Sequence, residues 1–290
     1  MAAAVAVATS LIATTHATAA TPGWGGYNGL STTEDTAFAT MVKDTPNYAN
    51  SYYTSNRTSV AKVEFDRIAK GITPNISVAT KNLNGCATCF MLWANIAAGK
   101  YDAFWRAWGQ SLAKLNHRVL FTFDQEPDAR LNHHMLPAQN PADYARAYRR
   151  IHNLIEPLAP KVEWSFWVGG SDKVKVTAMY PGDAYIDRIG WDPYKWSWHP
   201  ASETPLQTWS GFANWLNGQS WGKGKPRALF ETGIDVKHFG QARAAYWWSL
   251  APAAARTLGL QFFVLYNRVQ WCISGYSQVI SAYSTAMRSL

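Results

Sequence analysis

The chain has 290 residues, of which 48% are hydrophobic and 14% aromatic, and it carries 27 Lys and Arg against 19 Asp and Glu. This length and apolar content exclude a disordered chain and allow either one large domain or two smaller ones. The net charge of +8 is spread along the sequence without a basic arm or a nucleic-acid-binding motif, so nucleic acid is not expected as a partner.

The first twenty residues are small and apolar and end in an Ala-Thr-Ala-Ala run at residues 17–20. Such a run is typical of the cleavage site of a secretion signal, so we expect residues 1–20 to be a signal peptide and the protein to be secreted or held at the cell envelope. The segment lacks the positively charged N-terminal region of a usual signal peptide, because the first Lys or Arg is Lys43. An upstream start and a disordered tail therefore remain as alternatives. No run approaches the ~20 apolar residues of a membrane-spanning helix.

Apolar runs of strand length alternate with segments of helical period over residues 21–290, which is typical of repeated βα units and a parallel sheet. A Ser-Thr-Thr-Glu capping box at residues 31–34 and an Asn-Pro pair at residues 140–141 mark two helix starts. We expect eight strands, near residues 25–30, 48–53, 76–80, 119–123, 162–168, 186–191, 228–230 and 260–266. The sequence therefore predicts a single α/β domain, a (β/α)8 TIM barrel over residues 21–290.

Two glutamates stand at the ends of predicted strands: Glu126 follows the fourth and Glu231 the seventh. Their positions differ by 231 − 126 = 105 residues, which is three repeats of roughly 35 residues, the length of one βα unit in such a barrel. A closed barrel gathers the C-terminal ends of its strands on one face, so the two carboxyl groups should converge. Paired carboxylates in one cleft perform glycoside hydrolysis, and the spacing therefore predicts a glycosidase.

The three cysteines are Cys86 and Cys89, which form a Cys-x-x-Cys pair, and the distant Cys272. Without a second pair or a suitably spaced histidine, the pattern is not a zinc site. In an exported protein it favours a disulfide between Cys86 and Cys89 in the loop after the third strand, with Cys272 as a free thiol. A cysteine hydrolase remains as an alternative that lacks a positioned histidine. The adjacent His133 and His134 point apart in an extended loop, and we expect neither a metal nor a cofactor.

Aromatic residues are more numerous than a core requires, with 15 Trp and 14 Tyr. Aromatic faces pack against the C–H faces of sugar rings, so we expect roughly three to five of these residues in the cleft. Trp167 ends the fifth strand, and Trp196 and Trp198 follow the sixth. Arg268 follows the eighth strand and is either a hydrogen-bond donor to the substrate or a charged loop residue without a role in binding.

Three segments resemble the clan A glycoside hydrolases, and among them most closely family 26, which is of the β-mannanase type. They are Asp-Gln-Glu-Pro at residues 124–127, the block at residues 180–194, and Phe-Glu-Thr-Gly at residues 230–233. The most specific part is the pattern Pro-Gly-x-x-Tyr-x-Asp-x-Ile-Gly-x-Asp-x-Tyr in the second segment. The resemblance runs from about residue 100 to residue 268.

The resemblance implies that Glu126 is the general acid/base and Glu231 the nucleophile of a retaining mechanism. It also implies that Tyr194 hydrogen-bonds Glu231 and that Asp192 lies near the sugar subsite. A phenol donor supports an ionised nucleophile, and a more apolar surround favours a protonated acid. The family usually has His before the acid/base, whereas this chain has Gln125, whose amide can bond a sugar hydroxyl or the nucleophile. Mannan specificity is therefore not implied.

We thus predict a secreted, monomeric, retaining glycoside hydrolase of a β-linked polysaccharide or oligosaccharide, with internal cleavage favoured. The positive charge would suit an anionic substrate. The alternative is a non-catalytic glycan-binding barrel at the cell envelope, which the unusual Gln125 and Asp128 and the basic charge suggest. The two glutamates argue against it, because a lectin needs neither at these places.

Overall fold

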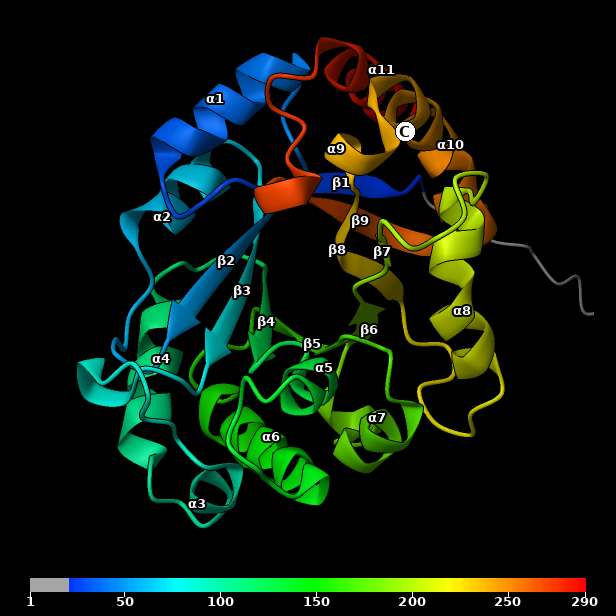
Figure 1. Ribbon diagram of the computed structural model, residues 1–290. Helices are drawn as coiled ribbons and strands as arrows, with labels where there is room; N and C mark the ends of the chain where they lie inside the picture. Colours follow the sequence, from blue (N-terminus) through cyan, green and yellow to red (C-terminus); the bar gives the residue numbers. More distant parts are fainter. Residues whose placement is uncertain (1–20) are drawn as a thin grey trace, which may run out of the picture.

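Eight parallel strands form a closed barrel in the computed structural model, which describes residues 21–290 (Figure 1). The expected signal peptide at residues 1–20 lies outside the described residues. The strands follow the order β6-β5-β4-β3-β2-β1-β9-β8, and pairing of β6 with β8 closes the ring. The predicted α/β TIM barrel is confirmed.

The barrel strands have the following bounds: β1 (Gly23–Tyr27), β2 (Tyr48–Thr54), β3 (Thr73–Ala79), β4 (Val119–Phe123), β5 (Val162–Val168), β6 (Arg188–Trp191), β8 (Arg227–Ile234) and β9 (Leu260–Tyr266). An additional short strand, β7 (Tyr194–Lys195), pairs with the end of β8.

Helices surround the strands (Figure 1): α1 (Thr32–Val42), α2 (Lys62–Ala69), α3 (Trp93–Ala97), α4 (Asp102–Ala113), α6 (Pro141–Ile155), α7 (Lys173–Met179), α8 (Pro205–Asn217), α10 (Gln241–Thr257) and α11 (Ser277–Arg288). The short helices α5 (Pro127–Asn132) and α9 (Val236–Phe239) follow β4 and β8. Three 3₁₀ turns complete the loops, namely η1 (Leu83–Gly85), η2 (Asp183–Tyr185) and η3 (Val269–Trp271). No helix among residues 21–290 is long and apolar enough to cross a membrane.

The two predicted helix starts are present, one of them in altered form. Asn140 caps α6 by accepting a hydrogen bond from the Ala142 N–H at 2.9 Å. Ser31 caps α1 by accepting from the Glu34 N–H at 3.3 Å. The Glu34 carboxylate does not complete the capping box, because it pairs with Arg268 from the far end of the chain.

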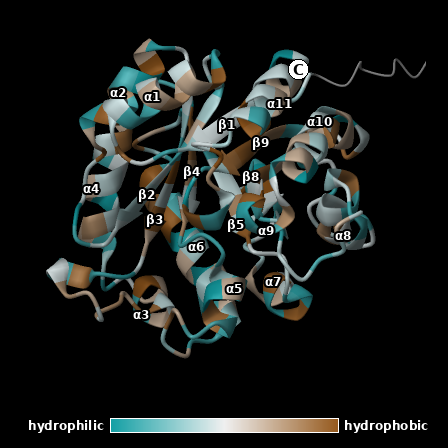
Figure 2. Cartoon of the chain, turned by 45° about the horizontal axis from the view of Figure 1, so that its top comes forward, coloured by the Kyte–Doolittle hydropathy of each residue, from teal (hydrophilic) through white to brown (hydrophobic). Residues whose placement is uncertain are grey.

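Most of the aromatic surplus lies in the core between the strands and the outer helices, and Figure 2 shows apolar residues along the strands and polar residues on the outer helix faces. A smaller cluster fills the inside of the barrel: Leu120, Trp167, Ala228, Phe230, Phe262 and Val264. Trp167 stacks on Phe230 with ring centroids 4.7 Å apart. These six side chains fill the barrel interior and are called its floor. The residues nearer the C-terminal ends of the strands form the mouth of the barrel.

Five strands differ from the predicted bounds: β2, β3 and β6 by one to three residues at an end, and β1 and β8 in ways that bear on the site. β1 begins earlier, because the register with β9 runs from Gly23 opposite Phe262 to Tyr27 opposite Tyr266. β8 extends four residues past Phe230 to Ile234, since β7 pairs with its last two residues. Glu231 therefore lies inside a strand rather than in the loop after it.

Candidate active site

Three carboxyl groups meet at the mouth of the barrel. Glu126 comes three residues after the end of β4, Asp192 directly follows β6, and Glu231 lies in β8. One oxygen from each lies within 4.8 Å of an oxygen from each of the others. The convergence that the sequence predicted for Glu126 and Glu231 is present, with Asp192 as a third member.

Glu231 is held by two phenols that come from opposite sides of the barrel. Tyr52 in β2 donates its hydroxyl hydrogen to Oε1, and Tyr194 in β7 donates to Oε2. The side chain is only 7% exposed. Hydrogen bonds from O–H donors stabilise the ionised carboxylate, which opposes the effect of burial. The structure thus contains the contact from Tyr194 that the resemblance implied and adds a second one from Tyr52.

Asp192 links Glu231 to the barrel floor. Its Oδ1 accepts the backbone N–H of Glu231 at 2.8 Å, and its Oδ2 accepts the indole N–H of Trp167. Trp167 was expected to be a sugar platform, but it is 0% exposed and its ring is covered by Phe230 and Tyr52. That expectation is wrong, because the ring faces the interior of the barrel; Trp167 orients Asp192 instead.

The loop that carries Glu126 has a strained backbone and buried supports. Asp124 and Glu126 both have left-handed conformations, with φ of 48° and 49°, which cost of order 1–3 kcal/mol each for such residues. The buried Asp124 carboxylate accepts hydrogen bonds from the Thr80 hydroxyl at 3.0 Å, the Trp93 indole at 2.8 Å and Arg130 at 2.7 Å. These contacts anchor the loop, so Asp124 fixes the backbone on which Glu126 stands.

Asp128 ties the same loop to the neighbouring strand. Its two oxygens accept the backbone N–H groups of Gly169 at 2.7 Å and Gly170 at 2.9 Å, directly after β5. Gln125 accepts a hydrogen bond from the Ser77 hydroxyl at 2.5 Å through its side-chain oxygen. The Gln125 amide nitrogen has no hydrogen-bond acceptor within residues 21–290, and it remains free to donate at the mouth.

Burial raises the pKa of all three carboxyl groups. For Glu231, burial and then the charge of Glu126 raise the pKa from its ordinary value of 4.5 to about 8, against the lowering effect of the two phenols. Burial, followed by the charges of Glu231 and Glu126, raises the pKa of Asp192 well above its usual range. Burial also raises the pKa of Glu126. Carboxyl groups this close titrate as one cluster, which keeps protons at a pH where isolated carboxyl groups would be ionised.

The side chains of Glu126 and Asp192 contact each other, and this contact lowers the pKa of Glu126, against the larger raising effect of burial, and raises the pKa of Asp192. The raised pKa of Asp192 favours the proton there, whereas the N–H donors on both of its oxygens favour its anion. Both oxygens of Glu231, by contrast, accept hydrogen bonds from phenols.

The same cluster is not assigned as a metal site. The oxygens are close enough to share a cation, but hydrogen-bond donors already approach both oxygens of Glu231 and both of Asp192. These hydrogen bonds would compete with a divalent cation for the carboxylate lone pairs.

Aromatic rings extend from the cluster along one side of the mouth. Tyr194 stacks on Trp271 at 4.5 Å, Trp271 meets the edge of Trp196 at 4.7 Å, and Trp196 stacks on Trp198 at 4.8 Å. Trp198 is 71% exposed. The structure thus places Trp196 and Trp198 beside the carboxyl cluster, connected to it through Trp271, which the sequence reasoning missed.

Arg268 lies on another side of the site. Its guanidinium group is 5.6 Å from the centre of the Tyr27 ring and pairs with Glu34. Tyr27 packs in turn against Tyr52 at 4.6 Å. Arg268 is therefore separated from Glu231 by two rings, and its charge is already paired.

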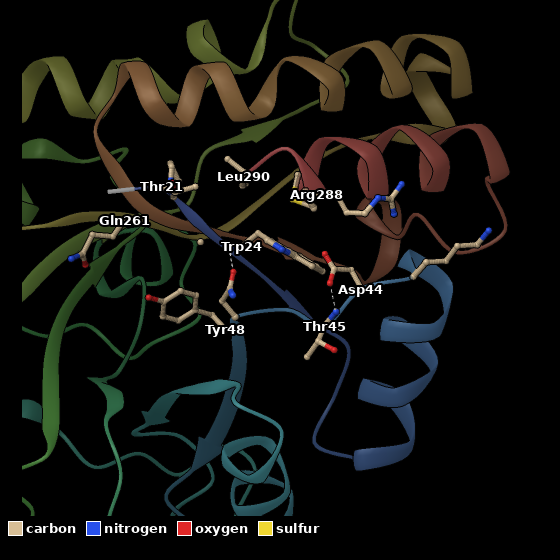
Figure 3. Close-up of a pocket in the computed structure, with 13 residues that line it drawn as sticks. Thr21, Trp24, Asp44, Thr45, Tyr48, Gln261, Arg288 and Leu290 are labelled. Atoms are coloured by element: carbon tan, nitrogen blue, oxygen red, sulfur yellow. Dashed lines mark hydrogen bonds between the residues drawn. The ribbon is translucent and has the colours of Figure 1, made fainter. Parts of the chain in front are cut away.

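The remaining predicted residues lie away from the carboxyl cluster. Cys86 and Cys89 form a disulfide with Cα atoms 5.2 Å apart, and Cys272 is a free thiol. A cavity of about 770 Å³ opens beside the starts of β1, β2 and β9 and the end of α11, with Trp24, Tyr48 and Gln261 in its wall (Figure 3). It lies at the N-terminal ends of the strands, and none of the three carboxyl groups lines it.

The sequence reasoning missed Tyr52 and its partner Asn50. Both belong to β2, and Asn50 is completely buried. Residues two apart in a strand face the same side. The sequence signal that could have found them is an asparagine two positions before a tyrosine in the second expected strand, which places both side chains on one face.

Comparison with known proteins finds likeness in structure alone. No protein-family model and no curated protein sequence matches the chain. The family 26 domain of an endo-β-mannanase/endo-β-glucanase from Prevotella bryantii is 14% identical with a TM-score of 0.63, over 90% of this chain and 88% of that one. The catalytic domain of a family 26 endo-β-1,4-mannanase from Bacillus sp. JAMB-750 is 14% identical with a TM-score of 0.64, over 93% and 86%.

A broad-specificity family 5 endoglucanase from an uncultured bacterium is 11% identical with a TM-score of 0.63, over 92% of this chain and 94% of that one. At these identities the likeness concerns the fold. The chain therefore shares its barrel with clan A glycoside hydrolases of families 26 and 5.

Proposed function

We propose that the protein is a retaining glycoside hydrolase, with Glu231 as nucleophile and Glu126 as general acid/base. The observation that carries this proposal is the carboxyl cluster at the barrel mouth, in which two phenols hold Glu231. We place the proton of the cluster on Glu126, because N–H donors on both oxygens of Asp192 favour its anion. One oxygen of Glu126 lies within 4.8 Å of one oxygen of Glu231, and so close a pair supports the retaining arrangement, in which the carboxyl groups are ~5–5.5 Å apart.

In the first step, a Glu231 oxygen attacks the anomeric carbon while Glu126 gives its proton to the departing glycosidic oxygen. The product is a glycosyl ester on Glu231 and a free sugar hydroxyl. In the second step, Glu126 takes a proton from water, and the resulting nucleophile attacks the same carbon and releases Glu231 as a carboxylate. Asp192 fixes Glu231 through the 2.8 Å contact with its backbone N–H.

We propose a β-linked polysaccharide or oligosaccharide as the substrate. The free amide nitrogen of Gln125 would bind a sugar hydroxyl, and the exposed ring of Trp198 would pack against a sugar further along the chain. The neighbours of this fold are named as endo-acting mannanases and glucanases, which supports internal cleavage. The net charge of +8 would suit an anionic glycan. We also propose that the protein acts as a secreted monomer.

The test is product analysis with purified protein on plant, fungal and bacterial-envelope polysaccharides, including acidic ones. Glu231→Ala should abolish product formation, and Glu126→Ala should spare only substrates whose leaving group needs no protonation. Glu156→Gln is the matched control, because Glu156 lies in the outer layer and accepts a hydrogen bond from Trp164 at 2.9 Å. Equal activity of Glu231→Ala and the parent would refute the proposal. Glycan binding without product on the whole panel would favour the non-catalytic barrel.

A further inference from the structure

We propose that Tyr52 is a second catalytic hydrogen-bond donor to Glu231, and that Asn50 is the positioning residue that orients its hydroxyl group. The inference rests on the proposed function of Glu231 and deepens it. It concerns strand β2, from which neither the sequence nor the family resemblance assigned a functional residue.

The contact crosses the barrel. β2 and β8 are separated in the sheet by β1 and β9, so the Tyr52 hydroxyl reaches Glu231 through the interior above the packed floor. Its ring is fixed between Tyr27 at 4.6 Å and Trp167 at 5.7 Å. A ring held on two sides has little freedom to move away when a substrate enters.

A buried chain of amides sets the direction of the Tyr52 hydroxyl. Asn75 in β3 donates to the side-chain oxygen of Asn50 at 2.7 Å. The Asn50 amide nitrogen then donates to the Tyr52 oxygen at 3.1 Å and to the Phe230 carbonyl at 2.6 Å. Because the Tyr52 oxygen accepts a hydrogen bond from Asn50, its own hydrogen is directed to Glu231. The chain of hydrogen bonds therefore runs from β3 through β2 to the nucleophile in β8, from Asn75 to Asn50, from Asn50 to Tyr52 and from Tyr52 to Glu231.

Two donors on one carboxylate affect the two chemical steps differently. In the first step Glu231 loses its negative charge as the ester forms, and in the second it regains that charge as a leaving group. Donors already in place stabilise the departing carboxylate without reorganisation. We therefore infer that Tyr52 accelerates the breakdown of the glycosyl ester more than its formation.

Several titratable groups face Glu231, and each bears on its ionisation. They are Glu126 after β4, Asp192 after β6, Tyr194 in β7, Tyr266 in β9, Tyr27 in β1 and Tyr52 itself. Within this set Tyr52 and Tyr194 lower the pKa of Glu231, whereas burial and the charge of Glu126 raise it. Loss of the Tyr52 hydroxyl should therefore make Glu231 harder to ionise.

The experiment is Tyr52→Phe, which removes only the hydroxyl group. At neutral pH we expect kcat to fall roughly 10- to 100-fold, the range for losing a hydrogen bond to a charged group. The acid limb of the kcat/KM profile should move to higher pH. KM should fall together with kcat as the glycosyl ester accumulates, and a burst of the first product should appear.

Tyr53→Phe is the matched control. Tyr53 is the next residue in β2, faces the opposite side, and donates its hydroxyl to another buried carboxylate, Glu64. This variant loses a comparable hydrogen bond outside the site. It should lose stability while its acid limb and its ratio of kcat to KM stay as in the parent.

Asn50→Ser tests the positioning role. It should shift the acid limb in the same direction as Tyr52→Phe, and by less. In the Tyr52→Phe background the same change should produce no further shift, because the hydroxyl that Asn50 orients is gone. Equal shifts of the limb by Asn50→Ser in both backgrounds would overturn the positioning role.

A readout without catalysis separates this inference from the proposed function. Carbon-13 NMR of labelled glutamates, with the Glu231 signal identified by its loss in Glu231→Gln, follows the ionisation of Glu231 directly. A rise in the pKa of Glu231 in Tyr52→Phe, without such a rise in Tyr53→Phe, supports the contact between Tyr52 and Glu231 even if no glycan is cleaved. An unchanged titration and an unchanged acid limb in folded Tyr52→Phe would overturn the inference, whatever the activity of the parent.

Discussion

Replacement of Glu126 by Gln tests which carboxyl group of the cluster donates the proton. Gln keeps the shape of the side chain and cannot deliver a proton. Hydrolysis of glycosides with poor leaving groups should fall by ~10²–10⁴-fold, the usual contribution of general acid catalysis. Substrates with an activated aryl leaving group should still form the glycosyl ester.

The magnitude of the pH effect follows from the distance between the charges. Carboxylate oxygens of Glu126 and Glu231 lie within 4.8 Å of each other, and two charges at that separation repel by about 3.5 kcal/mol at an effective dielectric constant of about 20. This repulsion adds roughly 2.5 pKa units to the second ionisation of the pair. With Glu126 protonated, Glu231 should ionise below its pKa of about 8. The parent should therefore have two well-separated limbs in its pH profile.

The assay is the pH dependence of kcat/KM with an activated aryl glycoside, in the parent and in Glu126→Gln. The variant should keep the acid limb, which reports Glu231, and lose the basic limb, which reports Glu126. Asp192→Asn is the comparison, since it removes the other possible holder of the shared proton and should keep both limbs. A basic limb that persists in Glu126→Gln and disappears in Asp192→Asn would refute our placement of the proton.

Three further predictions concern stability and binding. Because burial raises the pKa of Glu231 from 4.5 to about 8, the folded state binds more protons than the unfolded state between those pH values. The free energy of unfolding should therefore fall as pH rises through this window, and urea titrations of Glu231→Gln should show a weaker fall. Asp128→Ala should lower the free energy of unfolding by about 2–4 kcal/mol, because it leaves the N–H groups of Gly169 and Gly170 without their acceptor; an unchanged urea midpoint would contradict this. Trp198→Ala should raise KM for long oligosaccharides and leave short ones and the melting temperature nearly unchanged, as the ring is 71% exposed; equal effects on both substrate lengths would exclude it as a platform.

The barrel and the convergence of Glu126 and Glu231 could be predicted because both depend on a repeat length. Strands β4, β5 and β9 have the predicted bounds, since their apolar runs end at polar or glycine residues. The start of β1 could not be read from its glycine-rich sequence, because pairing with β9 defines it. The two-residue strand β7 likewise exists only through its pairing with β8.

The site residues likewise divide into those that the local sequence reveals and those that depend on the strand register or the loop conformation. Asp192 and Tyr194 could be found through a specific motif, whereas Trp167 was assigned to the wrong environment. A tryptophan near a strand end faces either the barrel interior or the helices, and only the strand register decides which. Trp271 comes from a 3₁₀ turn without periodicity, and its contact with Tyr194 depends on loop conformation.

The irregular pairing of β8 with β9 explains why the backbone N–H of Glu231 is free to donate a hydrogen bond to Asp192. Leu229 pairs with Phe263 and Thr232 with Leu265, so Phe230 and Glu231 together face a single residue of β9. Such a bulge interrupts the ladder of backbone hydrogen bonds and redirects a side chain, and bulges recur beside active sites. The Glu231 N–H, which is absent from the ladder, donates to Asp192 at 2.8 Å. The β8 backbone at this bulge thus fixes the position of Asp192 while the carboxylate above it remains available to Tyr52 and Tyr194. In a regular ladder that N–H would be committed to a backbone carbonyl of a neighbouring strand, and Asp192 would keep the Trp167 indole alone, so the proposed catalytic geometry depends on this irregularity as much as on the three acidic side chains.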